Sequence, residues 1–262
     1  MDIIKITDLD FKYNDKVIFD KLNLTIEEHK WYTLIGNNGS GKSTLVKLML
    51  GLIPTNNIII DNLLLSKNIF ETRKKIGVVF EIPDNNLVCE TVKEELAFSL
   101  ENIGTDVSKI DEQIKYITQK INIKNLIGKT INELNNLEKQ KVALASSLMT
   151  NPKILILDEA FTYLDNQEKD SMLSILKNLN ITIINITHDI EESLYGDNII
   201  ILNDGKIIRN NKKELIYQEE KLLNSIGINL PFIVELSNKL HYYGMLDKTV
   251  FSIKEMVNII WK

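Results

Sequence analysis

A glycine-rich stretch between an apolar run and an amphipathic run constrains this chain more than any other feature of its sequence. Residues 36–43 read Gly-Asn-Asn-Gly-Ser-Gly-Lys-Ser and fit the pattern G-x-x-x-x-G-K-[ST] at every fixed position. Apolar residues 31–35 predict a strand before this stretch, and the spacing over residues 42–52 predicts a helix after it. Glycines allow a tight bend with inward-facing amides at the positive end of a helix. The sequence therefore predicts a phosphate-binding loop, and a glycine-rich turn without a ligand is the weaker interpretation.

Within this loop, Lys42 is expected to reach the β- and γ-phosphates of a nucleotide, and the Ser43 hydroxyl to ligate Mg²⁺. The predicted nucleotide-binding residues here are Gly36, Asn37, Asn38, Gly39, Ser40, Gly41, Lys42, Ser43 and Thr44.

Two acidic residues end a second apolar run. Asp158 and Glu159 follow residues 154–157, and open α/β sheets bind ligands at the carboxyl ends of their strands. Asp158 is expected to hold Mg²⁺ through water, and Glu159 to polarise the attacking water as general base. Alone, the pair would equally suit a solvated strand end, but the phosphate-binding loop favours the catalytic interpretation.

A histidine follows a third apolar run. His188 lies just beyond residues 181–186, where its imidazole can donate a hydrogen bond to a γ-phosphate. His29 and His241 have no motif around them, and we expect both on the surface. The predicted catalytic residues are Lys42, Glu159 and His188.

The order of the predicted elements indicates an α/β fold. Short β-branched runs alternate with longer amphipathic runs, which is typical of a parallel sheet covered by helices on both faces. Strands are predicted at residues 3–6, 22–26, 31–35, 58–60, 76–80, 154–157, 181–186 and 198–202. Helices are predicted at residues 42–52, 92–100, 108–121, 138–149, 167–179 and 189–195. The runs 31–35, 154–157 and 181–186 are nearly all apolar and are expected to be the central strands.

A boundary is predicted between a main domain, residues 1–216, and an appendage, residues 217–262. Before it, residues 199–202 and 206–209 suggest a terminal hairpin that turns at 203–205. After it, residues 231–240 and 252–261 have the spacing of two short helices. The appendage is too short to form a core alone, so we expect it to pack on the main domain or on a partner.

Composition excludes several classes of protein. The 262 residues are 44% hydrophobic and 26% charged, which is an ordinary globular mix rather than that of a disordered chain. A net charge of −5 does not favour nucleic acid as a partner. Cys89 is the only cysteine, no apolar run approaches the ~20 residues that span a bilayer, and the first residues lack the pattern of a secretory signal. We therefore expect a cytosolic protein that binds no nucleic acid.

Taken in order, these segments resemble the ATPase subunit of ABC transporters. The resemblance rests on the phosphate-binding loop, Ile-Leu-Ile-Leu-Asp-Glu-Ala at 154–160, Thr-Tyr-Leu-Asp at 162–165 and Thr-His-Asp at 187–189, and covers roughly residues 1–215. It implies a P-loop NTPase fold with a RecA-like core, an antiparallel β subdomain and a helical subdomain at about residues 84–150. It also implies ATP as the nucleotide, with Asp165 and Asn135 among its contacts.

Finer features resemble one branch of that family, the ATPases of energy-coupling factor (ECF) transporters, which import vitamins and metal ions. Phe-Lys-Tyr at 11–13 is similar to the adenine-stacking segment of that branch, with Tyr13 at the stacking position. Residues 31–39, 77–86, 97–102 and 226–232, and the closing helix to Trp261, also resemble it, and fit the first of its two paralogous ATPases best. The resemblance implies a peripheral protein on the cytoplasmic face of the cell membrane. Its implied partners are a transmembrane scaffold and a membrane substrate-binding subunit, and its appendage is a dimerisation segment.

By the same resemblance, the segment after Phe80 faces the membrane subunit. A helix there receives arginines from the scaffold, and Glu94 and Glu95 are acidic residues that can pair with them. A solvated helix face is the alternative for each, and both interpretations stay open.

The resemblance fails at the signature loop, which in this family contacts the nucleotide held by the other subunit. The family's Leu-Ser-Gly-Gly-Gln aligns with residues 134–138, where only Leu134 matches. Leu137 adds bulk and Glu138 a carboxylate where backbone amides and a helix dipole should face the γ-phosphate, although Asn135 keeps an amide that can donate. Since losing one such donor typically costs about 10²–10³ in rate, we expect a poor catalytic partner.

Glu81 stands where the family has a glutamine that touches Mg²⁺ and the attacking water. Within the nucleotide site its carboxylate can ligate Mg²⁺ directly, but it would repel the phosphate and Glu159. At about 6 Å and an effective dielectric near 20, each pair of unit charges is worth about 3 kcal/mol. Attraction and repulsion are then comparable, so the sign of the effect stays open.

These departures favour a heterodimer. Each ATP site in such a dimer combines the phosphate-binding loop of one chain with the signature loop of the other, so a homodimer would place the altered loop in both sites. A second ABC ATPase with an intact signature loop would leave one competent site, built on Lys42, Asp158, Glu159 and His188. The leading hypothesis is an ATP-binding and hydrolysing subunit that powers an importer. A catalytically weak, nucleotide-binding regulatory subunit is the alternative, which the retained Glu159 opposes.

Overall fold

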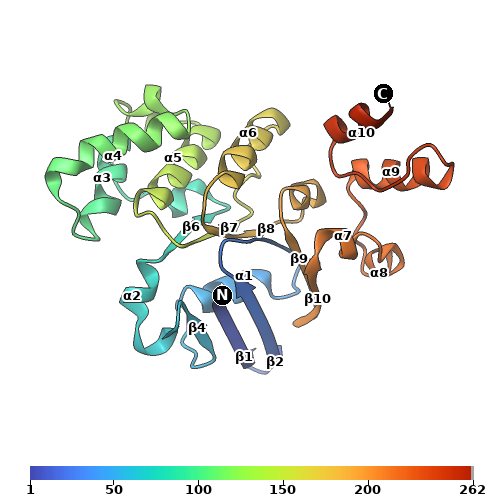
Figure 1. Ribbon diagram of the computed structural model, residues 1–262. Helices are drawn as coiled ribbons and strands as arrows, with labels where there is room; N and C mark the ends of the chain where they lie inside the picture. Colours follow the sequence, from blue (N-terminus) through green and yellow to red (C-terminus); the bar gives the residue numbers. More distant parts are fainter. Residues whose placement is uncertain (261–262) are drawn as a thin grey trace.

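A computed structural model of the chain describes residues 1–260 and builds them on two β-sheets (Figure 1). The larger sheet has six strands in the order β10-β9-β3-β8-β7-β6. Its strands are β3 (Trp31–Ile35), β6 (Ile76–Phe80), β7 (Ile154–Asp158), β8 (Thr182–Ile186), β9 (Asn198–Asn203) and β10 (Lys206–Lys212). All neighbours are parallel except β9 and β10, which form the expected hairpin. The three runs predicted as central strands occupy the middle of this sheet.

The smaller sheet is antiparallel, with strands in the order β2-β1-β4-β5. They are β1 (Asp2–Tyr13), β2 (Lys16–Glu27), β4 (Ile58–Ile60) and β5 (Leu63–Leu64). The predicted strands at 3–6 and 22–26 are too short, because β1 and β2 have 12 residues each. Register shifts in the β1–β2 ladder, among them one between Ile6 and Leu9, interrupt the alternation from which strand length is read.

The two faces of the larger sheet bury different layers. In β7, Ile154 and Ile156 face a core that includes α1 (Lys42–Met49) and the smaller sheet, whereas Leu155 and Leu157 face a helical layer. This period of two follows from the pleat of a strand. The helical layer contains α3 (Val92–Glu101), α4 (Val107–Lys120), α5 (Asn136–Met149) and α6 (Asn166–Lys177). The phosphate-binding loop thus lies between β3 and a helix enclosed by the two sheets.

Several predicted helix limits are wrong for local reasons. Helix α1 ends at Met49 rather than Leu52, because Gly51 takes a positive φ of 62°. Helix α5 begins at Asn136 rather than Glu138, because Asn135 caps it. Residues predicted as a helix at 189–195 form a 3₁₀ helix, η5 (Ile190–Leu194), because a short apolar spacing does not distinguish the two helix types.

The appendage packs on the outer part of the larger sheet. Helix α7 (Lys213–Ile216) ends the main domain, and the appendage contains α8 (Glu220–Ser225), α9 (Phe232–Tyr242) and α10 (Ile253–Ile260). Ile199 and Ile201 of β9 share one buried cluster with Val234 and Val250. Three short helices had not been predicted, α2 (Ile69–Arg73), α7 and α8, and Trp261 lies outside the described residues. Across residues 1–260, no helix has the length and hydropathy needed to cross a membrane.

Candidate functional site

The phosphate-binding loop has the backbone that its glycines permit. Gly41 has a φ of 110°, and a Cβ there would lie 2.8 Å from Cε1 of Phe19. Gly39 has a φ of 81° with nothing within 4 Å of its Cβ position, so this part of the loop stays open to a ligand. Phe19, on the β1–β2 hairpin, had no signal in the sequence, yet its ring packs against the loop at Gly41.

Lys42 is held over this loop. Its Nζ donates to the carbonyl oxygens of Gly36 at 2.7 Å and Asn37 at 3.2 Å. Burial lowers the pKa of Lys42, while the charges of Glu159 and Asp158 act in the opposite direction. A buried ammonium group at a helix start therefore sits ready for an anion, as the pattern predicts.

The acidic residues meet at the carboxyl ends of neighbouring parallel strands. Asp158 is paired in register with Phe80 of β6 and Ile186 of β8. Glu81 follows Phe80, and His188 follows β8 by two residues. The structure thus places the predicted acids and the histidine along one edge of the sheet, which is where such sheets bind ligands.

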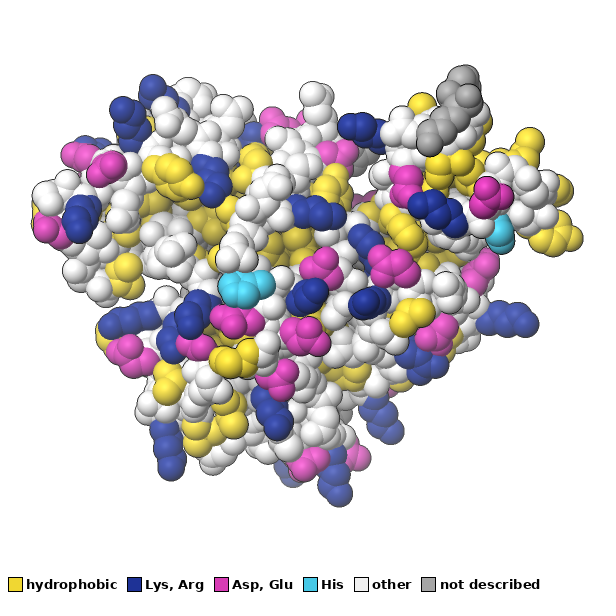
Figure 2. Space-filling model, in the orientation of Figure 1, with side chains coloured by type: hydrophobic (Ala, Val, Ile, Leu, Met, Phe, Trp, Pro, Cys, Tyr) yellow, Lys and Arg dark blue, Asp and Glu magenta, His cyan; other side chains and the backbone are white. Residues whose placement is uncertain are grey.

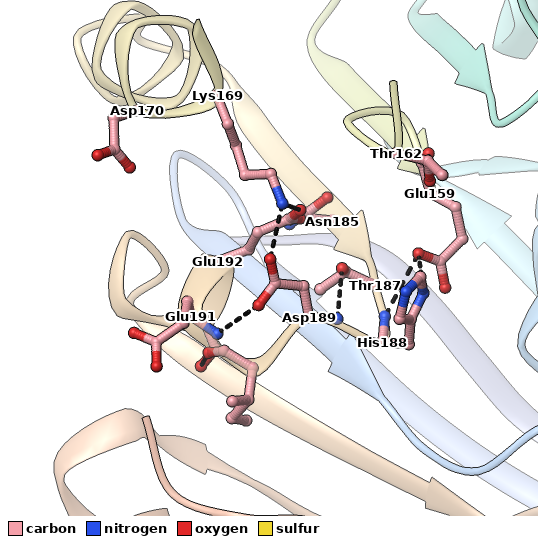
Figure 3. Close-up of polar contacts among 12 residues, drawn as sticks. Glu159, Thr162, Lys169, Asp170, Asn185, Thr187, His188, Asp189, Glu191 and Glu192 are labelled. Atoms are coloured by element: carbon pink, nitrogen blue, oxygen red, sulfur yellow. Dashed lines mark hydrogen bonds and ion pairs between the residues drawn. The ribbon is translucent and has the colours of Figure 1, made fainter. Parts of the chain in front are cut away.

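Glu159 and His188 are in direct contact (Figure 3). The Oε2 atom of Glu159 lies 2.7 Å from Nδ1 of His188 and 3.3 Å from its backbone nitrogen. Glu159 has a φ of 53°, and its backbone is held by its amide on the carbonyl of Ile186 and by the Thr162 hydroxyl on its own carbonyl, each at 2.9 Å. Non-glycine residues in this conformation are concentrated at functional positions. The side chain of His188 is 68% exposed, whereas that of Glu159 is only 18% exposed.

Asp158 sits among like charges. Burial and the neighbouring charges of Glu159 and Glu81 raise the pKa of Asp158 to about 6, against the opposing charges of Lys42 and Lys47. The ionised form of this carboxylate is disfavoured in the absence of a cation. A carboxylate is also an oxygen ligand of the kind that Mg²⁺ prefers. The chemistry of this site therefore fits Mg²⁺, which the predicted residues Ser43, Asp158 and Glu81 would hold.

Replacing Asp158 by asparagine should stabilise the protein in the absence of nucleotide. Because its folded pKa is raised above the unfolded value, stability is lost as pH rises from about 4 to about 6 and stays reduced above that range. Removing the charge should recover about 1–2 kcal/mol at neutral pH after allowance for solvent screening, while Mg²⁺-dependent ATP hydrolysis is lost. Urea unfolding at pH 5 and 7.5 measures this. Asp111→Asn, at an exposed ion pair with Lys93, is the control, and equal stability of Asp158→Asn and the unaltered protein at pH 7.5 would contradict the prediction.

Two further predicted contacts lie at element ends. Tyr13, the last residue of β1, is 45% exposed and meets Phe11 edge-on at 4.8 Å between ring centroids. Asp165 caps α6, where its Oδ1 accepts from the amide of Glu168 at 2.9 Å. Both leave a side chain at the surface, and neither assignment as a nucleotide contact goes beyond prediction.

The signature loop differs from its expected geometry in one respect. The Glu138 carboxylate accepts from the amide of Asn135 at 3.1 Å and from Nζ of Lys129 at 3.0 Å, and these two contacts lower the pKa of Glu138. The side chain of Asn135 in turn accepts from the Glu138 amide, which completes a capping box. The charge expected to face a phosphate is thus turned onto the start of its own helix. Leu137 packs partly against the helical core.

Both interpretations of Glu95 are wrong. It is 2% exposed, and its carboxylate accepts from the amides of Val88 at 2.8 Å and Cys89 at 3.0 Å and from the hydroxyl of Ser146 at 3.2 Å. It is therefore neither solvated nor available to a partner's arginine. Glu94 forms a capping box with Thr91 at the start of α3. The sequence places two acidic residues side by side but does not show that Glu95 is the one on the buried face of α3.

The side chains that hold the backbone before Glu81 also had no signal in the sequence. The amide of Gln140 donates to the carbonyl of Phe80 at 3.0 Å, and Asn86 accepts from the Phe80 amide at 2.9 Å. These contacts fix the backbone from which Glu81 starts.

Comparisons with known proteins agree with this geometry. Residues 19–162 match the family model described as ABC transporter. The chain is 35% identical to the energy-coupling factor transporter ATP-binding protein EcfA of Pediococcus pentosaceus, over 93% of this chain and 90% of that protein. The chain belongs to the ATP-binding subunits of ECF-type ABC transporters. It is also 36% identical to EcfA1 of Oenococcus oeni, over 100% of this chain and 98% of that protein.

Solved structures of ABC ATPases share the fold of this ECF ATPase. CbiO1 of Clostridium perfringens, described as part of the ABC transporter complex CbiONQ, has a TM-score of 0.76 and 30% identity over 90% of this chain and 99% of that one. An ATP-binding cassette dimer in a post-hydrolysis state with ADP and Pi has a TM-score of 0.72 and 26% identity over 80% and 98%. The predicted family, fold class and ATPase activity are confirmed.

Proposed function

We propose that this ECF ATPase hydrolyses ATP to drive an importer of vitamins or other micronutrients. The observation that carries the proposal is the Glu159–His188 contact at the strand ends beside Lys42. In this arrangement Lys42 binds the β- and γ-phosphates, Glu159 takes the proton of the attacking water, and His188 donates to the γ-phosphate. Mg²⁺ held by Ser43 and Asp158, beside Glu81, would neutralise phosphate charge.

The partner ATPase in this proposal carries an intact signature loop. The altered loop of this chain then completes a weak site on the partner, and the partner's loop completes a strong site on this chain. The alternative, a catalytically weak regulatory subunit, is favoured by Glu81 and by the altered loop. Glu159 opposes it, because nucleotide binding alone needs no carboxylate paired with a histidine.

The appendage is the proposed dimerisation segment. Hydrophobic side chains gather over α9 and the turn that follows it (Figure 2). The large exposed ones at the end of α9 and in that turn are Tyr242, Tyr243 and Met245, which are between 68% and 84% exposed. A cluster of this kind is typical of a protein–protein interface.

A groove between the larger sheet and the helical layer is the proposed docking site for the membrane scaffold. It has a volume of about 430 Å³ and runs along β6. Its lining combines an exposed aromatic ring, two cations and several hydroxyl and amide groups, from Phe70, Arg73, Lys74, Asn86, Ser99, Asn102, Ser146, Ser147 and Thr150. Because β6 ends at Glu81, a scaffold segment in this groove would contact the strand that leads to the ATP site. In this proposal the subunit is peripheral, on the cytoplasmic face of the membrane.

The variant Phe70→Ala tests this docking. Phe70 is 64% exposed, so its loss should leave the fold intact but reduce co-purification with the membrane scaffold and substrate-binding subunit by about tenfold, as expected for an interface anchor. Tyr116→Ala, with Tyr116 62% exposed on α4, is the matched control. Undiminished co-purification of Phe70→Ala with the membrane subunits would place the docking site elsewhere.

A further inference from the structure

A polar cluster lies beside His188, on the side away from Glu159 (Figure 3). Nζ of Lys169, on α6, lies 2.6 Å from Oδ2 of Asp189 and 3.2 Å from Oε1 of Glu192. The other oxygen of Glu192 accepts from the side-chain amide of Asn185 at 2.9 Å. Glu192 and Asn185 are almost fully buried, at 4% and 0% exposure. One cation thus serves two carboxylates on the segment that follows His188.

The charges in this cluster depend on one another. Burial raises the pKa of Glu192, while hydrogen bonds and charge from Asn185 and Lys169 oppose that rise. Burial disfavours the charged form of Lys169, yet Asp189 and Glu192 together raise its pKa, so it stays protonated. Without Lys169, two neighbouring carboxylates would repel each other next to β8, and breaking a buried ion pair is costly.

The cluster fixes the backbone on the far side of His188. Asp189 accepts from Lys169 through Oδ2 and from the amide of Glu191 through Oδ1 at 3.0 Å, while its own amide donates to the Thr187 hydroxyl at 3.0 Å. Among residues 1–260, the exposed imidazole of His188 makes a single polar contact, which is with Glu159. The direction of the imidazole is therefore set by Glu159 in front and by the anchored Asp189 behind.

Lys169 also lies on α6, the first α-helix that follows Glu159 in the chain. Its amide donates to the carbonyl of Asp165 at 2.8 Å, one turn into α6. The side chain of Lys169 thus joins the segment after β7 to the segment after β8, and these two segments carry the two groups that act on the γ-phosphate.

We infer that Lys169 is a positioning residue, which holds His188 in line with Glu159 through Asp189. The inference rests on the role of His188 proposed above. Loss of the ion pair lets the 187–189 backbone move, and misplacement of a catalytic group costs rate more than substrate affinity.

Steady-state ATP hydrolysis by the assembled complex tests this inference in four variants: Lys169→Met, Lys169→Arg, His188→Ala and the double variant Lys169→Met/His188→Ala. Lys169→Met should lower kcat at least tenfold with the KM for ATP within threefold, and Lys169→Arg, which keeps the ion pairs, should restore most of the rate. In the His188→Ala background, Lys169→Met should add little further loss, because residues that act through one another are not additive. Lys177→Met, an exposed lysine on the same helix, is the control.

A second variant keeps the test decisive if Lys169→Met folds poorly. The triple change Lys169→Met/Asp189→Asn/Glu192→Gln removes all three charges with little change of volume, so no buried charge is left unpaired, and it should show the same loss of kcat. Full and independent losses from Lys169→Met in both His188 backgrounds, or a loss seen in KM alone, would overturn the inference. A slow His188→Ala enzyme with a fast Lys169→Met enzyme overturns the inference only, whereas a fast His188→Ala enzyme contradicts the role of His188 and the inference with it.

Discussion

Replacing Glu159 by glutamine should lower ATP turnover of the assembled complex by about 10²–10⁴, the range for loss of a general base. Glutamine keeps the size of the side chain and can still meet His188, but it cannot accept the proton of the attacking water. The phosphate-binding loop and Lys42 are untouched, so MgATP binding should stay within about threefold. The variant should accumulate as an ATP-bound dimer, visible by size exclusion with MgATP.

Glu112→Gln, at an exposed position of α4, makes the same chemical change away from the site and should leave turnover unaltered. The regulatory alternative gives a different result. If this chain only binds nucleotide, turnover of the complex would hardly change in Glu159→Gln, and hydrolysis would be assigned to the partner ATPase.

Restoring the signature loop should accelerate hydrolysis at the site that this loop completes. The quadruple variant Asn135→Ser/Asn136→Gly/Leu137→Gly/Glu138→Gln returns a hydroxyl and the unobstructed amides to the start of α5. Serine and glutamine can still form the capping box, so the helix start should be retained. Because one preorganised donor is typically worth about 10²–10³ in rate, the isolated dimer of the variant should hydrolyse ATP at least 10²-fold faster than that of the unaltered chain.

The same assay with the partner ATPase tests the proposed asymmetry. The unaltered chain alone should be slow, and its mixed complex fast, because the mixed complex already has one intact signature loop; the quadruple variant should therefore add at most about twofold there. Glu133→Gln is the matched control, since Glu133 closes a similar capping box with Thr130 just before the loop, with a contact of 2.7 Å. An unaltered chain that alone hydrolyses ATP as fast as the mixed complex would remove the reason for a heterodimer.

The sequence by itself determined the features that depend on consecutive residues. The glycine pattern at 36–43 specifies its own backbone, since positive φ angles at Gly39 and Gly41 need no distant partner. The apolar runs of β3, β7 and β8 indicate fully buried parallel strands, and parallel strands bring their carboxyl ends to one edge. Asp158, Glu159 and His188 could therefore be placed together before any contact was known.

Only the tertiary structure decided which charges in this protein are partnered. Glu95 bonds to Ser146, 51 residues away, and Lys169 bonds to Asp189, 20 residues away. Lys129 adds an ion pair to Glu138, whose carboxylate the local capping box with Asn135 already turns onto the start of its own helix. Such pairs form when separate helices and strands are packed against one another, and no local pattern records which face of a helix will be covered. The free energy of a charge depends on burial and on its partner, so its role is fixed only when the fold supplies both.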